Sequence, residues 1–473
     1  MHSILVLFVL AVLSLLSLLA CRRAPAPHDG PIVLITFDSL RADVVGGLGG
    51  SPGLMPHLDA LIREADWAGR GIAPSSAGVP AMASVFTGLQ PWQNQALQPE
   101  QASLGDELIT LPEALAAYGY ATAGYSSGFW YSERFGYSQG FAVFQGLSRG
   151  RQALDRLGNL GGGRHFVWVH LPEPQPPWVL HEEMVPRLNL RLPLELPRRI
   201  VPAQIEPYFD PAEILPTGRR RQFWAMYRLN AAWGDQRLGR LLDALRASGQ
   251  WDRTLLVVTS NHGEELGEHG QVLDGGNLGR RLLEVPLVIK LPAGFARPLL
   301  PLKNERPGTV RLWATLVEAV GGTKPPAQAP SLFHPSPSGV LSELYLTNGT
   351  NQFSWVEGDN QLLWESRFAA PEGEYYRARL AALRPNVALA EPAPAIFGRL
   401  SAAFHATPPF SGIGAPRLTL ERWDARGSHP VDDPRPKAEM ARRLAAAWSR
   451  FVPVELPPGE EAGRWRTMGR ETG

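Results

Sequence analysis

Four short apolar runs dominate the hydrophobic pattern of the chain. Each has the length of one strand and is rich in β-branched residues, as in strands that are buried on both faces of a sheet. They comprise residues 31–37, 165–171, 254–260 and 285–290. Between the second and third runs, apolar residues recur at helical spacing from Tyr227 to Leu245, and Gly249 follows where the helix should end. Strands separated by helices of this length predict an α/β fold, with a large, mainly parallel sheet between two layers of helices.

The polar and proline-rich stretches between these elements predict the domain organisation. Residues 171–222 are rich in proline and are expected to form a long surface excursion. Residues 352–366 resemble a β-hairpin with its turn at 358–360, and residues 436–451 have a helical pattern. The predicted segments are a signal peptide or anchor (1–21), a tether (22–30), the α/β domain (31–325), a Pro-rich linker (326–340), a C-terminal α+β subdomain (341–455) and a disordered tail (456–473).

The N-terminus carries a Leu-rich, uncharged run directly before Cys21, the only cysteine of the chain. Its length fits a signal peptide or a short membrane anchor. The letters "LLAC" resemble a bacterial lipobox, which would make Cys21 the lipidated first residue of a lipoprotein in the cell envelope, facing the periplasm or the exterior. Arg22 and Arg23 follow the run, and this favours the opposite orientation. An uncleaved anchor and a wrongly assigned start are therefore the alternatives. The single cysteine predicts a globular part without disulfides.

Composition narrows the class of partner. The chain has 473 residues, 44% of them hydrophobic, and a formal net charge of +1. A near-neutral chain offers no electrostatic basis for binding nucleic acid, which selects clustered Lys and Arg. The Arg-rich stretch 218–222 is interpreted as a solvated surface.

Candidate chemistry lies at the ends of two predicted strands. Asp38 follows the first run, while Asn261 and His262 follow the third. The carboxyl ends of parallel strands meet at one edge of a sheet, so these side chains are expected to converge there. Their oxygen and nitrogen atoms suit a divalent metal ion. The alternative for Asp38 is that it caps a helix beginning at Leu40.

These motifs, in this order, resemble those of the sulfatase family of the alkaline phosphatase superfamily. The resemblance is carried by "IVLITFDSLRADVVGG" (32–47), "VPAMASVFTGLQP" (79–91), "SNHGEELGEHG" (260–270) and, near the C-terminus, "LERWDARGSHPVDDP" (420–434). It implies an alkaline-phosphatase-like fold and hydrolysis of sulfuric or phosphoric esters. It also implies a divalent metal, Ca²⁺, with Asp38, Asn261 and His262 at metal-binding positions.

The chain departs from the family at the residues that carry the chemistry. The nucleophile position is Gly78, which has no side chain to attack with. Met82 stands for an arginine that stabilises negative charge, and Gln175 stands for a histidine that contacts the transferred group. Asn261 replaces a metal-binding aspartate, and a family lysine is replaced near Gly275. Covalent catalysis of the family type is therefore not expected.

Two classes of function follow. The favoured one is a catalytically impaired member that binds an anionic sulfate- or phosphate-bearing ligand, or a protein partner, at the cleft, with calcium bound weakly or not at all. The alternative is an active metal-dependent hydrolase that uses activated water or another nucleophile. Ser75 and Ser76 are candidates for that nucleophile, although such pairs usually form turns. A zinc site at His262, Glu265 and His269 is a further alternative, but the histidine spacing differs from the helical zinc motif.

Overall fold

The computed structural model describes most of residues 26–444. Outside the description lie the N-terminal run with Cys21, the tail 456–473 and His269. Among the residues described, no helix has both the length and the apolar character needed to cross a membrane. The stretches left out between 26 and 444 are 95, 98–103, 106–107, 147–150, 189–195, 209–214, 269, 297–298, 300–305, 325–328, 336–338, 346–349, 368–416, 425–426, 432, 434, 438 and 441–442.

A seven-stranded sheet forms the centre of the larger domain, in the order β2-β11-β8-β1-β5-β3-β4. The central strands β8, β1, β5 and β3 are parallel, and each pairs with the next along its length. The strands are β1 (Ile32–Asp38), β2 (Trp67–Ile72), β3 (Ala121–Ser126), β4 (Val143–Gly146), β5 (His165–Pro174), β8 (Leu255–Ser260) and β11 (Glu284–Lys290). The predicted large and mainly parallel sheet is confirmed.

Strand β11 departs from the parallel type that its composition predicts, because it runs antiparallel to both β8 and β2. The chain leaves the carboxyl end of β8 at Ser260 and reaches β11 through a loop and the short helix α8 (Arg280–Leu283). A parallel partner needs a crossover to the opposite edge of the sheet, and this connection stays at the same edge. Strands β2, β3 and β4 are additional to those that the hydrophobic pattern predicts.

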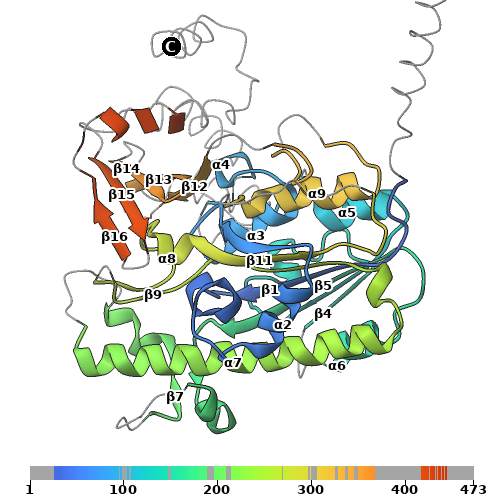
Figure 1. Ribbon diagram of the computed structural model, residues 1–473, viewed down its shortest axis with the longest axis horizontal. Helices are drawn as coiled ribbons and strands as arrows, with labels where there is room; N and C mark the ends of the chain where they lie inside the picture. The colour runs from blue at the N-terminus through green and yellow to red at the C-terminus, as the bar shows by residue number, and fades with distance from the viewer. Residues whose placement is uncertain are drawn as a thin grey trace, which may run out of the picture.

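Helices cover both faces of the sheet (Figure 1). One layer contains α2 (Pro56–Glu64), α6 (Arg151–Gly158) and α7 (Thr217–Ala247). The other contains α3 (Gly78–Thr87), α5 (Leu111–Ala117) and α9 (Leu312–Ala319). Helix α7 starts before the end of the predicted surface excursion, so the exposed arginines at 219–221 belong to its first turns. Its end agrees with the sequence, because Gly249 adopts a φ of 71°, a conformation that favours glycine.

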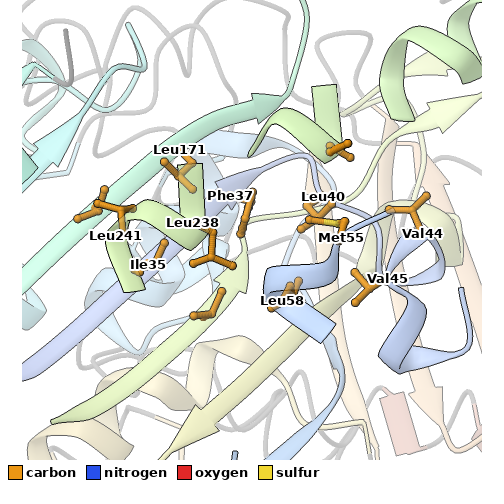
Figure 2. Packing of buried hydrophobic residues seen from close by; sticks show 14 of the residues in the cluster. Ile35, Phe37, Leu40, Val44, Val45, Met55, Leu58, Leu171, Leu238 and Leu241 are labelled. Atoms are coloured by element: carbon orange, nitrogen blue, oxygen red, sulfur yellow. The ribbon is translucent and has the colours of Figure 1, made fainter. Parts of the chain in front are cut away.

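The first helical layer is fixed by a buried apolar cluster (Figure 2). Ile35 and Phe37 of β1 pack against Leu238 of α7 and Leu58 of α2, and all four are fully buried. Burying one such side chain contributes about 1.5–3 kcal/mol relative to leaving it in water. This packing holds the end of β1, and therefore Asp38, in a fixed position.

A second, antiparallel sheet of five strands follows, in the order β12-β13-β14-β15-β16. The predicted hairpin is confirmed, since Glu357 pairs with Asn360 across a two-residue turn. Where residues 435–444 are described they are helical, and Met440 and Leu444 pack on this sheet. In the predicted linker, Leu332 is buried against the larger domain. The strands are β12 (Val340–Tyr345), β13 (Thr350–Glu357), β14 (Asn360–Arg367), β15 (Arg417–Asp424) and β16 (Gly427–Pro430).

Candidate functional site

The candidate site is a cleft at the carboxyl ends of β1, β5 and β8. Its volume is about 850 Å³, and Asp38, Gly78, Gln175 and His262 are among the residues that line it. Ligands of open α/β sheets bind at this edge because the loops that follow neighbouring parallel strands all begin there. The structure thus brings together the strand-end residues that the sequence predicts to converge.

Asp38 is the buried carboxylate at the end of β1. Trp168 Nε1 donates to Thr36 Oγ1 at 3.0 Å, and the same hydroxyl shares a hydrogen bond with Nδ1 of His170 at 2.8 Å. Nε2 of His170 donates to Asp38 Oδ2 at 3.4 Å, because an ionised carboxylate can only accept. Burial alone would raise the pKa of Asp38, but the hydrogen bond and charge of His170, with His262 and Asn261, hold the pKa below its usual value.

Asp38 does not cap a helix, because no helix begins at Leu40 in this fully described stretch. The first helical turn after β1 is a 3₁₀ turn, η1 (Ala42–Val44), and the residue before it is Arg41. The Asp38 carboxylate instead belongs to the cleft.

Asn261 presents an amide NH₂ group to the site. Its Oδ1 accepts hydrogen bonds from the backbone N–H of Ser39 at 3.0 Å and of His262 at 2.7 Å. Because both partners can only donate, the oxygen of Asn261 must face them, and Nδ2 faces the cleft. Nδ2 donates to Asp38 Oδ1 and to the Tyr131 hydroxyl, both at 2.7 Å.

Gly78 is the first residue of α3, and the space beside it is occupied. A Cβ atom at this position would lie 2.5 Å from the Tyr131 hydroxyl oxygen and 3.1 Å from Nε2 of His262. Tyr131 is buried, and burial together with the charge of Asp38 raises its pKa well above the usual value. A neutral phenol thus occupies the place into which a nucleophile at residue 78 would project.

Met82 and the serine pair lie away from the cleft lining. Met82 is fully buried in the apolar cluster beneath α3. Ser75 accepts a hydrogen bond from the backbone N–H of Ala77 at 3.3 Å, as in a local serine turn, and Ser76 is equally buried. Neither serine is among the residues that line the cleft.

Gln175 connects the end of β5 to a carboxylate that sequence reasoning missed. Its Oε1 accepts from the Ser39 hydroxyl, and its Nε2 lies 3.4 Å from Asp274 Oδ1. Asp274 follows β10 (Val272–Leu273). Its only sequence signal is its place beside Gly275, where the family resemblance expects a lysine. Tyr131 and His170 were also missed, because an aromatic residue in a loop and a histidine inside an apolar strand are usually structural.

His262 directs an unpartnered nitrogen into the cleft. Its Nδ1 donates to the carbonyl oxygen of Gly263 at 2.6 Å, because a carbonyl oxygen can only accept. Nε2 is buried and has no hydrogen-bond partner. It lies 3.6 Å from Asp38 Oδ1 and 3.5 Å from Asp274 Oδ2.

The residues present do not fit the calcium site that the family implies. Calcium takes six to eight oxygen ligands, and its affinity rises with ligand charge. Here the oxygen of Asn261 accepts from two backbone N–H groups, and Asp38 is the only carboxylate among the three positions that the family resemblance implies. In the part of the chain that is described, no group of three or more His, Cys, Asp or Glu side chains is placed to hold a metal ion.

The zinc alternative of His262, Glu265 and His269 lies partly outside the described residues. Glu265 lies in the short strand β9 (Glu265–Leu266), and His269 lies outside the description. Nε2 of His262 faces Asp38 and Asp274 instead.

The charges around the cleft are predominantly negative. Among the described residues that line it, none is Lys or Arg, while Asp38, Glu173, Glu206 and Asp274 are acidic. Glu173 is paired with Arg237 at 2.6 Å. Below the lining, burial and the charges of Asp274 and Asp38 raise the pKa of Glu264 well above its usual value.

The fold and the strand-end site define the class of protein: an α/β domain with the alkaline-phosphatase-like arrangement of a mixed sheet between helices. The family model described as Sulfatase matches residues 31–170 and 200–322, which is more than half of the chain. The chain therefore belongs to the sulfatase family.

Individual relatives agree with this assignment. The multifunctional alkaline phosphatase superfamily protein PehA of Trinickia caryophylli is 34% identical over 136 residues, which cover 28% of this chain and 26% of that protein. The match thus spans about a quarter of the length of this relative. A 2-O GAG sulfatase superposes with a TM-score of 0.57 at 16% identity, covering 80% of this chain and 91% of the other. The phosphonate monoester hydrolase of Agrobacterium radiobacter gives a TM-score of 0.54 at 17% identity, covering 85% and 100%. Likeness at this identity shows the fold alone.

Proposed function

We propose that this chain is a binding member of the sulfatase family that has lost the covalent hydrolysis of its relatives. The observation that carries the proposal is the position of Gly78. The residue has no nucleophilic side chain, and the buried Tyr131 hydroxyl fills the space where one would project. No modification of glycine creates a side-chain oxygen there, so a covalent sulfate or phosphate ester has no group on which to form.

The surroundings of Gly78 support the same proposal. An arginine at position 82 would stabilise developing negative charge, whereas Met82 is buried in an apolar cluster. Gln175 is engaged with Ser39 and Asp274. Removing a single oxyanion donor typically costs about 10²–10³ in rate, and groups that act as a unit lose their effect together.

The available hydroxyl groups do not replace the nucleophile. Ser75 and Ser76 are buried outside the cleft lining, and Tyr131 is held in its neutral form by burial beside Asp38. One observation favours hydrolysis by activated water as the second candidate function. It is the Nε2 atom of His262, which has no hydrogen-bond partner and faces the cleft next to Asp38, where a proton-transfer group for water activation would lie.

The proposal includes a ligand and a location. The family resemblance favours an anionic sulfate- or phosphate-bearing ligand or a protein partner at the cleft, and the likeness to a GAG sulfatase supports this class. The apolar run before Cys21 favours attachment to the membrane of a bacterial cell envelope, by lipidation of Cys21 or by an uncleaved anchor.

The test is a turnover assay on the full chain in detergent micelles, with millimolar Ca²⁺ supplied. We expect no hydrolysis of an aryl sulfate, a phosphate monoester, a phosphate diester or a phosphonate monoester above that of Asp38→Ala. Gly78→Ser is expected to remain inactive, because the charge-stabilising groups are still absent. The Asp38→Ala comparison removes any signal from a contaminating phosphatase. Asp38-dependent hydrolysis of any of these esters by the unmodified chain would reject the proposal in favour of the second candidate.

A further inference from the structure

We propose that the amino ends of the central strands, with Arg164 and Arg253, face the membrane that holds the chain. The cleft then opens away from this membrane and takes its ligand from the surrounding water. The proposal rests on the membrane attachment that is part of the proposed function. It also narrows the ligand class, because it favours a water-soluble molecule or polymer over the phospholipid headgroups of that same membrane.

The start of the described chain is fixed at the amino edge, which is the edge of the central sheet where its parallel strands begin. His28 donates its backbone N–H to the carbonyl oxygen of Ala319 at 2.8 Å, and its own carbonyl oxygen accepts from the Tyr120 hydroxyl at 3.0 Å. The carbonyl oxygen of Pro31 accepts from the backbone N–H of Leu255, the first residue of β8, at 3.0 Å. In Figure 1 this start lies at the end of the sheet where α7 ends. The chain therefore enters the domain at the amino edge.

The tether between the apolar run and the amino edge is short. Residue 26 is the first that the structure describes, and Cys21 ends the predicted signal peptide or anchor segment. The five residues from one to the other span at most about 18 Å when fully extended. Asp38, at the far end of β1, lies about 20 Å beyond Ile32 at the usual rise of a strand. A membrane that holds Cys21 thus lies close to the amino edge, and the length of β1 separates this edge from the base of the cleft.

The side chains of the amino edge suit phospholipid headgroups. Arg164 and Arg253 are both exposed there. Arg164 donates to the carbonyl oxygen of Tyr118 at 3.0 Å, and Arg253 donates to that of Gly162 at 3.2 Å, so both guanidinium groups are held at the surface. Tyr118 is itself 38% exposed. Tyrosine and arginine are typical of the boundary between a bilayer and water, because each combines an apolar part with a polar end.

The charges of the two edges favour the same orientation. At the amino edge the exposed Asp29 pairs with Arg253 at 3.4 Å, and Asp252 is the chain neighbour of this arginine. At the opposite edge, the described lining of the cleft contains four acidic residues and no Lys or Arg. An anionic bilayer attracts arginines near its surface and repels carboxylates, and both effects fall off within about 10 Å. Such a bilayer therefore draws the amino edge toward itself and the mouth of the cleft away.

The orientation is tested with the full chain in nanodiscs of phosphatidylglycerol and phosphatidylcholine, with a nitroxide on some of the headgroups. A fluorophore is attached through an introduced cysteine, by Gly161→Cys at the amino edge or Ala203→Cys beside the cleft. Both positions are exposed: a Cβ at residue 161 would lie 3.6 Å from the His165 ring, and Ala203 follows Pro202 of the cleft lining. A headgroup nitroxide quenches only at short range. We expect quenching at residue 161 to be at least about threefold stronger than at residue 203. The unmodified chain, labelled in parallel, gives the signal of Cys21, which is subtracted.

Charge reversal locates the contact. In the Gly161→Cys chain, Arg164→Glu together with Arg253→Glu should lower the quenching about twofold or more, because two attractive charges become repulsive. The matched control is Arg219→Glu together with Arg221→Glu in the first turns of α7. These arginines are also exposed, and the change in net charge is the same. The control should leave the quenching at residue 161 unchanged.

Three results would overturn the proposal. One is quenching at residue 203 that equals or exceeds the quenching at residue 161. The second is quenching at residue 161 that Arg164→Glu with Arg253→Glu leaves unaltered. The third is an equal loss in the α7 control variant, which would show that the domain lies on α7 instead of on the amino edge.

Failure of the proposed function gives different signals. A full chain that does not associate with the nanodiscs contradicts membrane attachment, and the orientation falls with it. A reactive Cys21 in the unmodified chain contradicts lipidation, whereas the difference between residues 161 and 203 still decides the orientation. Asp38-dependent turnover of an ester contradicts the proposed loss of catalysis and is measured independently of the quenching.

Discussion

Gly78→Ala tests directly whether the nucleophile position is closed. The new Cβ would lie 2.5 Å from the Tyr131 hydroxyl oxygen and 3.1 Å from Nε2 of His262, well inside van der Waals contact. Tyr131 is buried and held by the hydrogen bond from Asn261 at 2.7 Å, so it cannot simply turn away. Overpacking of this kind costs about 1–3 kcal/mol, and the helix preference of alanine over glycine returns roughly 0.5–1 kcal/mol. We expect a net loss of about 1–2 kcal/mol in the free energy of unfolding.

Tyr131→Phe removes the atom that the new Cβ would strike. Alone it should cost about 1 kcal/mol, because it ends the hydrogen bond from Asn261. In the double variant the clash is relieved. The loss in free energy of unfolding of the double variant should therefore be smaller than the sum of the losses of the two single variants, by about 1–2 kcal/mol. The free energy of unfolding of the unmodified chain, the two single variants and the double variant is measured by urea unfolding of the full chain in detergent, monitored by tryptophan fluorescence.

The matched control is Gly218→Ala in the first turn of α7, where an added Cβ would meet no atom within 4 Å. It should be neutral or stabilise the chain by up to about 0.5 kcal/mol. The reasoning is refuted if Gly78→Ala is as stable as the unmodified chain, or if the effects of Gly78→Ala and Tyr131→Phe are additive.

Three further predictions concern metal, pH and the core. Asn261→Asp replaces the amide donor beside Asp38 by a carboxylate, so it should destabilise the chain by roughly 2–3 kcal/mol without metal and regain part of this in millimolar Ca²⁺. The unmodified chain should show the same thermal midpoint in Ca²⁺ and in EDTA. A rise of that midpoint in Ca²⁺ would contradict the conclusion that the residues of the cleft do not fit a calcium site. Burial raises the pKa of Asp235 to about 6 from 3.8, so the folded state binds more protons and this group's contribution to stability should fall as the pH rises from about 4 to 6. That component should be absent in Asp235→Asn, and an unchanged slope in urea titrations across this range would argue against it. Leu238→Ala, in the cluster of Figure 2, should cost about 2–5 kcal/mol, whereas Val143→Ala, 42% exposed on β4, should cost less than about 0.5 kcal/mol; equal costs would show that α7 does not anchor the sheet.

The predictions from sequence were accurate where one local pattern decides the structure. The β-branched runs became β1, β5 and β8, because a strand buried on both faces must be apolar along its whole length. The helical spacing that ends at Gly249 predicted the C-terminal end of α7, because the apolar spacing and the glycine that follows it are both local features of the sequence. The direction of β11 was not determined by its composition, since the length and path of the preceding connection set it.

The candidate site likewise has features that the sequence determines and features that only the tertiary structure decides. The sequence by itself determined that Gly78 offers no nucleophile and that Asp38, Asn261 and His262 reach one edge of the sheet, because residue identity and strand polarity are local properties. Only the tertiary structure decided that Tyr131 fills the vacated space, that the amide of Asn261 turns its NH₂ toward Asp38, and that Asp274 joins the cleft. These three facts depend on loops that are distant in sequence meeting at one edge, where the orientation of each polar group is fixed by the donors and acceptors that its neighbours leave unpaired.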